Sequence, residues 1–251
     1  MKFDSVAGRL LRLPLRFIPD RTIMRVRSGL NKDLRWRVGS ATHGCWLGHY
    51  ESEVQRQLPG LIREGMVCFD IGANAGFYTL ALARLAGPTG RVFAFEPLAQ
   101  NAANLLHHLR LNNLSQASLV QVAVSDSDGL TGFEVHESAS MGRLNSGSTT
   151  NYLVPSVRLD TVMARDQLPA PNFIKMDVEG AELAALTGAE ATLADHRPTL
   201  LIAFHGEHLF VGCLQFLAGL GYAICDLDGH PLSSKDHPVN EVIATHPGSL
   251  S

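Results

Sequence analysis

The sequence predicts an α/β protein with a mostly parallel sheet covered by helices on both faces. From Met66 onward, short apolar runs alternate with helix-length stretches, an order that produces right-handed βαβ units. The chain has 251 residues, 45% of them hydrophobic and 18% charged, which is ample for a full core and excludes a disordered or fibrous chain. Acidic residues close most of the apolar runs, where an open α/β sheet binds its ligand.

The elements follow in a regular order until the middle of the chain. The predicted strands are 66–72, 91–97, 118–126, 173–180, 199–206 and 222–229. The helix-length stretches between them include 77–87, 98–113 and 181–194. Residues 241–247 would add a last strand at the sheet edge.

The segment between 126 and 173 breaks this order. Residues 130–137 and 153–159 resemble added strands, so we expect an inserted β-hairpin and loop at about 127–160. The loop between them, Ser138 to Asn151, is rich in Ser, Gly and Thr. We expect a lid there, with Arg143 contacting the substrate, while a passive surface loop is the alternative.

Cysteine usage and the N-terminus indicate a cytoplasmic protein. The four cysteines form no CxxC pair and no Cys/His metal spacing. Arg9, Arg12 and Arg16 interrupt the N-terminal leucines, which argues against a secretory signal. The uncharged stretch Leu209 to Cys225 contains three glycines and is too short for a membrane helix.

The net charge of −3 conceals an uneven distribution. Residues 1–37 carry ten Lys/Arg against three Asp/Glu, whereas residues 38–251 carry eleven against twenty-one. We therefore expect a basic, partly helical extension over 1–60 and a separate main domain over 61–251. The extension would contact anionic lipid or another subunit, or simply pack on the body; nucleic acid is not expected, because the body is acidic.

Two motifs point to a nucleotide-type ligand. In Asp70-Ile-Gly-Ala-Asn-Ala-Gly76, the two glycines allow a sharp strand-to-helix turn and close approach of a ligand to backbone N–H groups. The spacing is not the dinucleotide pattern G-x-G-x-x-G. Glu96 closes the next apolar run, where a carboxylate can accept both ribose hydroxyl hydrogens. A structural glycine turn and a helix-favouring acid are the alternatives.

The segment Lys175 to Glu182 carries the candidates for chemistry. Lys175, Asp177 and Glu179 alternate along a predicted strand and would share one face, and Glu182 could face the same cleft. His205 ends another predicted strand and would lie beside Asp177 if the two strands are neighbours. A histidine there can accept a hydroxyl proton. Asp177, Glu179 and His205 could also hold a metal, but the sequence requires none.

These motifs together resemble a known family. FDIGANAGFYTL, FAFEP, VAVSD, VRLDTV and FIKMDVEGAELAALTGA are similar, in order and spacing, to FkbM-type S-adenosylmethionine-dependent methyltransferases. The segment Gly44 to Glu51 also resembles the one that precedes the family's first strand. The resemblance implies a Rossmann-like, seven-strand class I methyltransferase sheet and S-adenosylmethionine as cofactor.

The resemblance also implies roles for individual residues. It implies that the methionine part of the cofactor lies against Asp70, Gly72, Ala73, Asn74 and Gly76. It implies that the ribose lies at Glu96 and Pro97. The adenine would lie near Ala123, Val124, Ser125 and Asp126. The catalytic candidates are Lys175, Asp177, Glu179, Glu182 and His205.

The implied reaction is methyl transfer to a hydroxyl oxygen of a small molecule or glycan. The acceptor itself cannot be read from the residues. An inactive cofactor-binding accessory protein is one alternative. An NAD-type oxidoreductase is another, disfavoured by the G-x-N-x-G spacing.

Overall fold

The computed structural model describes residues 18–135, 142–144 and 152–247. The expected lid therefore lies outside the described residues, except for 142–144. The first 17 residues of the basic extension also lie outside them.

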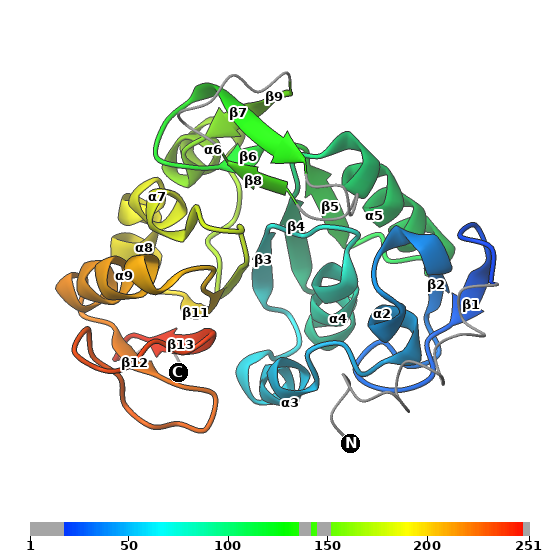
Figure 1. Ribbon diagram of the computed structural model, residues 1–251, viewed down its shortest axis with the longest axis horizontal. Coiled ribbons are helices and arrows are strands. Elements are labelled where there is room, and N and C mark those ends of the chain that lie inside the picture. The colour runs from blue at the N-terminus through cyan, green and yellow to red at the C-terminus, as the bar shows by residue number, and fades with distance from the viewer. Residues whose placement is uncertain (1–17, 136–141, 145–151, 248–251) are drawn as a thin grey trace.

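A seven-stranded sheet forms the centre of the molecule (Figure 1). Its strand order is β12-β13-β11-β10-β3-β4-β5. The bounds are β3 Val67–Ile71, β4 Arg91–Phe95, β5 Ala117–Val120, β10 Phe173–Met176, β11 Thr199–Ala203, β12 Ala223–Cys225 and β13 Glu241–Thr245. Strands β5, β4, β3, β10 and β11 pair in parallel, which confirms the predicted mostly parallel sheet.

The prediction that 241–247 lies at the sheet edge was wrong. Strand β13 lies between β11 and β12 and is antiparallel to both, so β12 is the edge strand. Burial gives the reason. Val242, Ile243 and Ala244 are consecutive and all buried, which only an interior strand covered on both faces allows, whereas Ala223 of β12 is exposed.

Strand residues alternate between two cores, one on each face of the sheet. Cys68, Leu201 and Ile243 point into one core, and their neighbours Phe69 and Ile202 point into the other. The first core is covered by α2 His43–Leu47, α3 Ser52–Leu61, α4 Phe77–Ala86 and α5 Ala99–Leu111. The second is covered by α6 Leu159–Asp166, α7 Glu182–Thr187, α8 Glu190–His196 and α9 Glu207–Gly219. The predicted helix over 181–194 is thus two helices.

A smaller sheet lies beside the carboxyl ends of the central strands. Its order is β6-β9-β7-β8, with β6 Ala123–Val124, β7 Gly129–Val135, β8 Gly142–Leu144 and β9 Leu153–Val157. This confirms the inserted strands. It also divides the predicted strand 118–126, because β5 ends at Val120 in the main sheet and β6 belongs to the small one.

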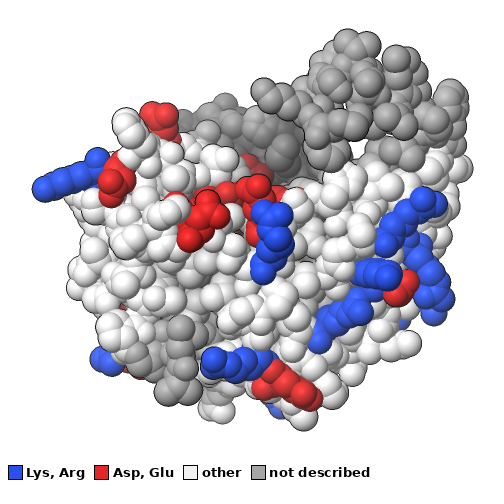
Figure 2. Space-filling view, turned by 90° about the horizontal axis from the view of Figure 1, so that it is seen from below, with Lys and Arg blue, Asp and Glu red and all other residues white. Residues whose placement is uncertain are grey.

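The described part of the N-terminal extension packs on the main body. It forms β1 Ile23–Arg25, β2 Arg35–Arg37, the short helix η2 Val38–Ser40, and then α2 and α3. Trp36 and Leu58 are fully buried in the first core with residues of α4 and α5. Arg25, Arg27, Lys32 and Arg35 are exposed there, and Lys and Arg gather on that side of the molecule in Figure 2.

His108 of α5 links the N-terminal extension to the main body. It is buried and stacks on Trp36, with ring centroids 3.9 Å apart. Its Nδ1–H donates to the carbonyl of Ala75 at 2.7 Å, and its Nε2 accepts from the backbone N–H of Arg37 at 3.1 Å. Because burial favours the neutral ring, the pKa of His108 falls to about 4. His108 therefore connects the end of β2 to the turn after β3 through two hydrogen bonds.

Among the described helices, none is both long and apolar enough to cross a membrane. The uncharged stretch near the C-terminus divides between α9 and β12.

Candidate active site

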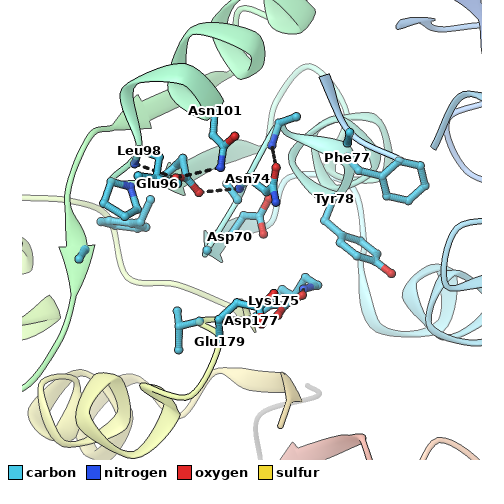
Figure 3. Close-up of a pocket in the computed structure, with 18 of the residues that line it drawn as sticks. Asp70, Asn74, Phe77, Tyr78, Glu96, Leu98, Asn101, Lys175, Asp177 and Glu179 are labelled. Carbon is cyan, nitrogen blue, oxygen red and sulfur yellow. Dashed lines mark hydrogen bonds and ion pairs between the residues drawn. The ribbon is translucent and has the colours of Figure 1, made fainter. Parts of the chain in front are cut away.

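The connection order places a crevice between β3 and β10. The chain runs outward from β3 through β4 to β5 and returns to β10 on the other side of β3, so the chain diverges at the carboxyl ends of β3 and β10. A cavity opens at this point. Its walls include residues of the turn after β3, the end of β4, β6 and the segment after β10. Figure 3 shows Glu96 and Asn74 on one side of it and Asp177 and Glu179 on the other.

The turn after β3 requires glycine. Gly72 has φ +83°, and a Cβ at this position would lie 1.8 Å from the carbonyl oxygen of Asp177. The N–H groups of Gly72 and Ala73 both donate to the carbonyl of Phe95, at 2.9 and 3.0 Å. Gly76, with φ +92°, then precedes α4. The backbone of the turn is therefore held tightly against β4 and the segment after β10, and it forms one wall of the cavity.

Glu96 follows β4 and is held by groups of the neighbouring loops. Its Oε2 accepts the N–H of Asn74 at 2.8 Å, and its Oε1 accepts the N–H of Leu98 at 2.8 Å and the side-chain amide of Asn101 at 3.4 Å. The residue is only 4% exposed. Burial raises the pKa of Glu96 to about 7, against the opposing effect of these N–H donors.

Asp70 ends β3 and is almost fully buried. The hydroxyl of Thr79 donates to its Oδ2 at 2.6 Å. Lys175 is its register partner on β10. Burial raises the pKa of Asp70, although the charge of Lys175 opposes the shift.

Lys175 and Asp177 form a close ion pair. Lys175 Nζ lies 2.9 Å from Asp177 Oδ2 and 4.5 Å from the centre of the Tyr78 ring. The Tyr78 hydroxyl in turn donates to Glu51 Oε2 at 2.6 Å. Burial alone would lower the pKa of Lys175 and raise that of Asp177, but their mutual attraction prevails and shifts both the other way. Both residues therefore remain charged near neutral pH.

His205 lies beside Asp177, as predicted, because β11 pairs in parallel with β10. Its Nε2 is 3.5 Å from Asp177 Oδ1 and 3.5 Å from Glu179 Oε2. Its Nδ1–H donates to Glu182 Oε1 at 3.0 Å. The hydrogen bond to Glu182 is the main reason that the pKa of His205 rises to about 8; partial burial opposes the rise, and the charges of Asp177 and Glu179 add to it.

Several predicted site residues line the cavity and others do not. The predicted residues that line it are Asp70, Gly72, Ala73, Asn74, Glu96, Pro97, Ala123, Val124, Lys175, Asp177 and Glu179. Gly76 lies behind the turn, against Leu105 of α5. His205 contacts the lining carboxylates from outside the cavity wall. Glu182 was expected to face the cleft, but it is fully buried behind His205.

Ser125 and Asp126 are not among the residues that line the cavity, unlike Ala123 and Val124, and their expected place at the adenine stays a prediction. The N–H of Ser125 donates to Val157, so the chain after β6 follows β9 instead of the cavity wall. Asp126 is exposed, and its carboxylate accepts from the hydroxyls of Ser125 and Ser127.

Sequence reasoning missed an aromatic wall. Trp36, Tyr50, Phe77 and Tyr78 all line the cavity. Tyr50 belongs to the segment Gly44 to Glu51, whose resemblance to the family was the one available signal. Trp36 comes from β2, in the N-terminal extension, which was not expected to contribute to the site, and nothing in its local sequence marks it.

Two groups of described residues have the spacing of metal ligands. Ligand atoms of Asp177, Glu179 and His205 lie within 4.8 Å of one another, and so do those of Asp226, Asp228 and His230. In both groups, contacts between histidine and carboxylate account for the spacing. We therefore assign no metal to either.

The comparison with protein families agrees with this site. Residues 70–224 match the model of the methyltransferase FkbM domain. The chain is similar to hexuronic acid methyltransferase AglP from Haloferax volcanii, with 27% identity over 55% of this chain and 56% of that protein. It is also similar to 2-O-methyltransferase NoeI from Sinorhizobium fredii, with 28% identity over 77% of this chain and 86% of that protein.

A solved structure shows the same fold. The crystal structure of methyltransferase FkbM from Methylobacillus flagellatus superposes with a TM-score of 0.52 at 20% identity, over 81% of this chain and 55% of that one. The chain thus spans little more than half the length of this protein and of AglP. The cofactor of this family is S-adenosylmethionine. Because the family match covers more than half of the present chain, the chain belongs to the FkbM methyltransferase family.

Proposed function

We propose that the protein transfers a methyl group from S-adenosylmethionine to a hydroxyl oxygen of a small molecule or glycan. The observation that carries the proposal is the convergence of Asp177, Glu179 and His205 at the side of the cavity opposite Glu96. The site thereby has two ends with different chemistry: a cofactor end at Asp70 and Glu96, and an acceptor end at Asp177, Glu179 and His205. Two relatives, a hexuronic acid methyltransferase and a 2-O-methyltransferase, support an oxygen acceptor on a sugar.

The residues of the first end suit the cofactor. Gly72 lets the segment after β10 pack directly against the turn, and the backbone of the turn lines the cavity, where a ligand can contact it. Asp70 and Glu96 would hold the cationic and ribose parts, since their oxygens have only neutral or shared partners here. When bound, S-adenosylmethionine supplies a methyl group activated by the positive sulfur.

The second end suits a hydroxyl group that must lose its proton. Asp177 lines the cavity and stays ionised beside Lys175, so it can accept a hydrogen bond from the acceptor hydroxyl. His205 Nε2 stands next to Asp177 Oδ1, and the His205 side chain is 34% exposed. Above pH 8, where the His205 ring is mostly neutral, the Asp177–His205 pair would therefore take the hydroxyl proton and release it to solvent, as the new C–O bond forms and the bond between the methyl carbon and sulfur breaks.

A methyl-transfer screen tests the proposal. The wild-type protein is incubated with radiolabelled S-adenosylmethionine and sugars, polyketides or phenols, and each product is located by mass spectrometry and NMR. We expect an O-methylated product with at least one hydroxylated acceptor. Cofactor binding without transfer to any acceptor would instead favour the inactive accessory protein, and transfer only to nitrogen would contradict an oxygen acceptor.

A further inference from the structure

We propose that Glu182 is a positioning residue that fixes the ring of His205 for proton transfer without touching substrate or cofactor itself. The proposal rests on the proposed function, because it assigns His205 a share in removing the acceptor's proton. Glu182 begins α7, whereas His205 follows β11. The contact therefore joins two elements that meet only in the folded chain.

The geometry determines which ring nitrogen carries the proton. Glu182 Oε1 lies 3.0 Å from His205 Nδ1 and can only accept a hydrogen bond when ionised. Nδ1 must then carry a proton, and in the neutral ring, which prevails above pH 8, Nε2 keeps its lone pair. That lone pair is on the side of Asp177 and Glu179, each 3.5 Å from Nε2. Glu182 thus turns the proton-accepting nitrogen toward the carboxylates that line the cavity.

Burial indicates that this contact has a function beyond stability. Glu182 is 0% exposed, and its Oε2 has no hydrogen-bond partner among the described residues. Enclosing a carboxylate with one oxygen unpaired costs free energy, and an uncharged group of the same shape is often no worse for stability. A residue that served stability alone would not need this charge.

Glu182 also has a structural contact, which the test must separate from its effect on His205. The N–H of Gly180 donates to the same Oε1 at 3.0 Å. This bond supports the turn at Glu179 and Gly180, whose φ values of 51° and 98° are both left-handed. Glutamine at position 182 has the same shape and can keep its oxygen on Gly180 and on His205 Nδ1, so it removes the charge and leaves the acceptor in place, whereas methionine removes both.

The charged groups around His205 come from three segments. Glu182 lies on α7, Asp177 and Glu179 lie in the segment after β10, and Lys175, which pairs with Asp177, lies on β10. Removing the charge at 182 leaves the other three in place. The effect on His205 can therefore be attributed to Glu182.

The first experiment needs no acceptor. Nitrogen-15 NMR of the imidazole rings in the full chain reports both tautomer and titration of His205, identified by its absence in His205→Gln. We expect Glu182→Gln to lower the pKa of His205 by roughly one unit and to keep the Nδ1–H tautomer, because its amide oxygen still accepts from Nδ1–H. Glu182→Met, which offers no oxygen acceptor, should also reduce the share of that tautomer. Glu190→Gln, an exposed acid in the first turn of α8, is the matched control and should change neither. An unchanged His205 pKa in Glu182→Gln, or an unchanged tautomer in Glu182→Met, would overturn the proposal.

The second experiment measures turnover. With an acceptor from the screen, and above pH 8 where the His205 ring is mostly neutral, Glu182→Gln should keep most of kcat. Glu182→Met should lower kcat roughly 100-fold and leave the cofactor Kd and the acceptor KM within about twofold. In a His205→Gln background, the same change should have no further effect on kcat, because Glu182 acts through His205. Equal losses in both backgrounds, or a weaker cofactor affinity, would show a structural role and contradict the proposal. The absence of any turnover in the wild type would count against the proposed function and leave the NMR result to decide the role of Glu182.

Discussion

The two ends of the cavity hold their carboxylates in different ways. At the cofactor end, Glu96 and Asp70 accept hydrogen bonds from neutral N–H and O–H groups of the turn and of α4 and α5. At the acceptor end, Asp177 and Glu179 contact the cationic Lys175 and the titratable His205. Burial raises the pKa of both carboxyls at the cofactor end, and a positively charged ligand would favour their ionised form, whereas the acceptor end is already ion-paired and contains a group that can exchange a proton.

The largest expected effect is at the acceptor end. Asp177→Asn and His205→Ala should each lower kcat roughly 10²–10⁴-fold, because each removes a member of the pair that takes the proton. Calorimetry should show cofactor Kd values close to the wild type, since neither residue belongs to the turn after β3. Circular dichroism checks the fold, which matters for Asp177→Asn because it removes the ion-pair partner of the buried Lys175. Near wild-type turnover in both variants would place the chemistry elsewhere.

The second largest effect concerns the pH dependence of the protein's folding stability, through a histidine near the cofactor end. His108, which supports Ala75 in the turn, has a pKa of about 4 when folded against an ordinary value of 6.5. A lowered pKa means that the unfolded chain binds the proton more readily, so stability is retained above pH 6.5 and lost as the pH falls towards 4. The loss should reach about 3 kcal/mol.

Denaturant unfolding from pH 7 to pH 4.5 measures this loss for the wild type and for His108→Gln. The variant lacks the titrating ring, so the part of the pH dependence due to His108 should disappear. If the free energy of unfolding falls equally steeply with pH in both proteins, protonation of His108 is not the cause of the lost stability.

Glu96 tests the cofactor end directly. Glu96→Gln keeps the shape and one carbonyl oxygen but loses the charge, and S-adenosylmethionine affinity should fall by about 1.5–3 kcal/mol, as for a hydrogen-bonded charge. Isothermal calorimetry gives the affinity, and circular dichroism confirms that the variant is folded. Glu190→Gln, far from the cavity lining, serves as the control. An unchanged affinity would remove Glu96 from the cofactor site.

The smallest expected effect is that of chelation. Because Lys175 and His205 already pair with Asp177 and Glu179, EDTA should change turnover by less than about twofold. To check this, turnover of an acceptor identified in the screen is measured before and after addition of EDTA, and again after Mg²⁺ or Mn²⁺ is added back. A loss restored by one ion would show that the acceptor end binds a metal rather than only a proton.

The sequence predicted the cofactor end better than the acceptor end. Gly72, Asn74 and Glu96 are marked by local rules, since a sharp turn needs glycine and an acid that closes a strand lies at the carboxyl edge of the sheet. Strand periodicity also placed His205 beside Asp177, subject only to the pairing of two strands. These features depend on near neighbours along the chain or on a single pairing.

The sequence by itself determined the alternating α/β order, the inserted strands and the acids at the strand ends, because strand burial and turn geometry leave local patterns. Tertiary structure alone decided that β13 lies inside the sheet, that Trp36 and Tyr50 reach the cavity, and that Asp126 does not. It also decided that Glu182 is buried against His205 and that His108 supports the turn. These outcomes depend on which distant surfaces pack together, and burial of a side chain is a property of that packing rather than of the residues beside it in the chain.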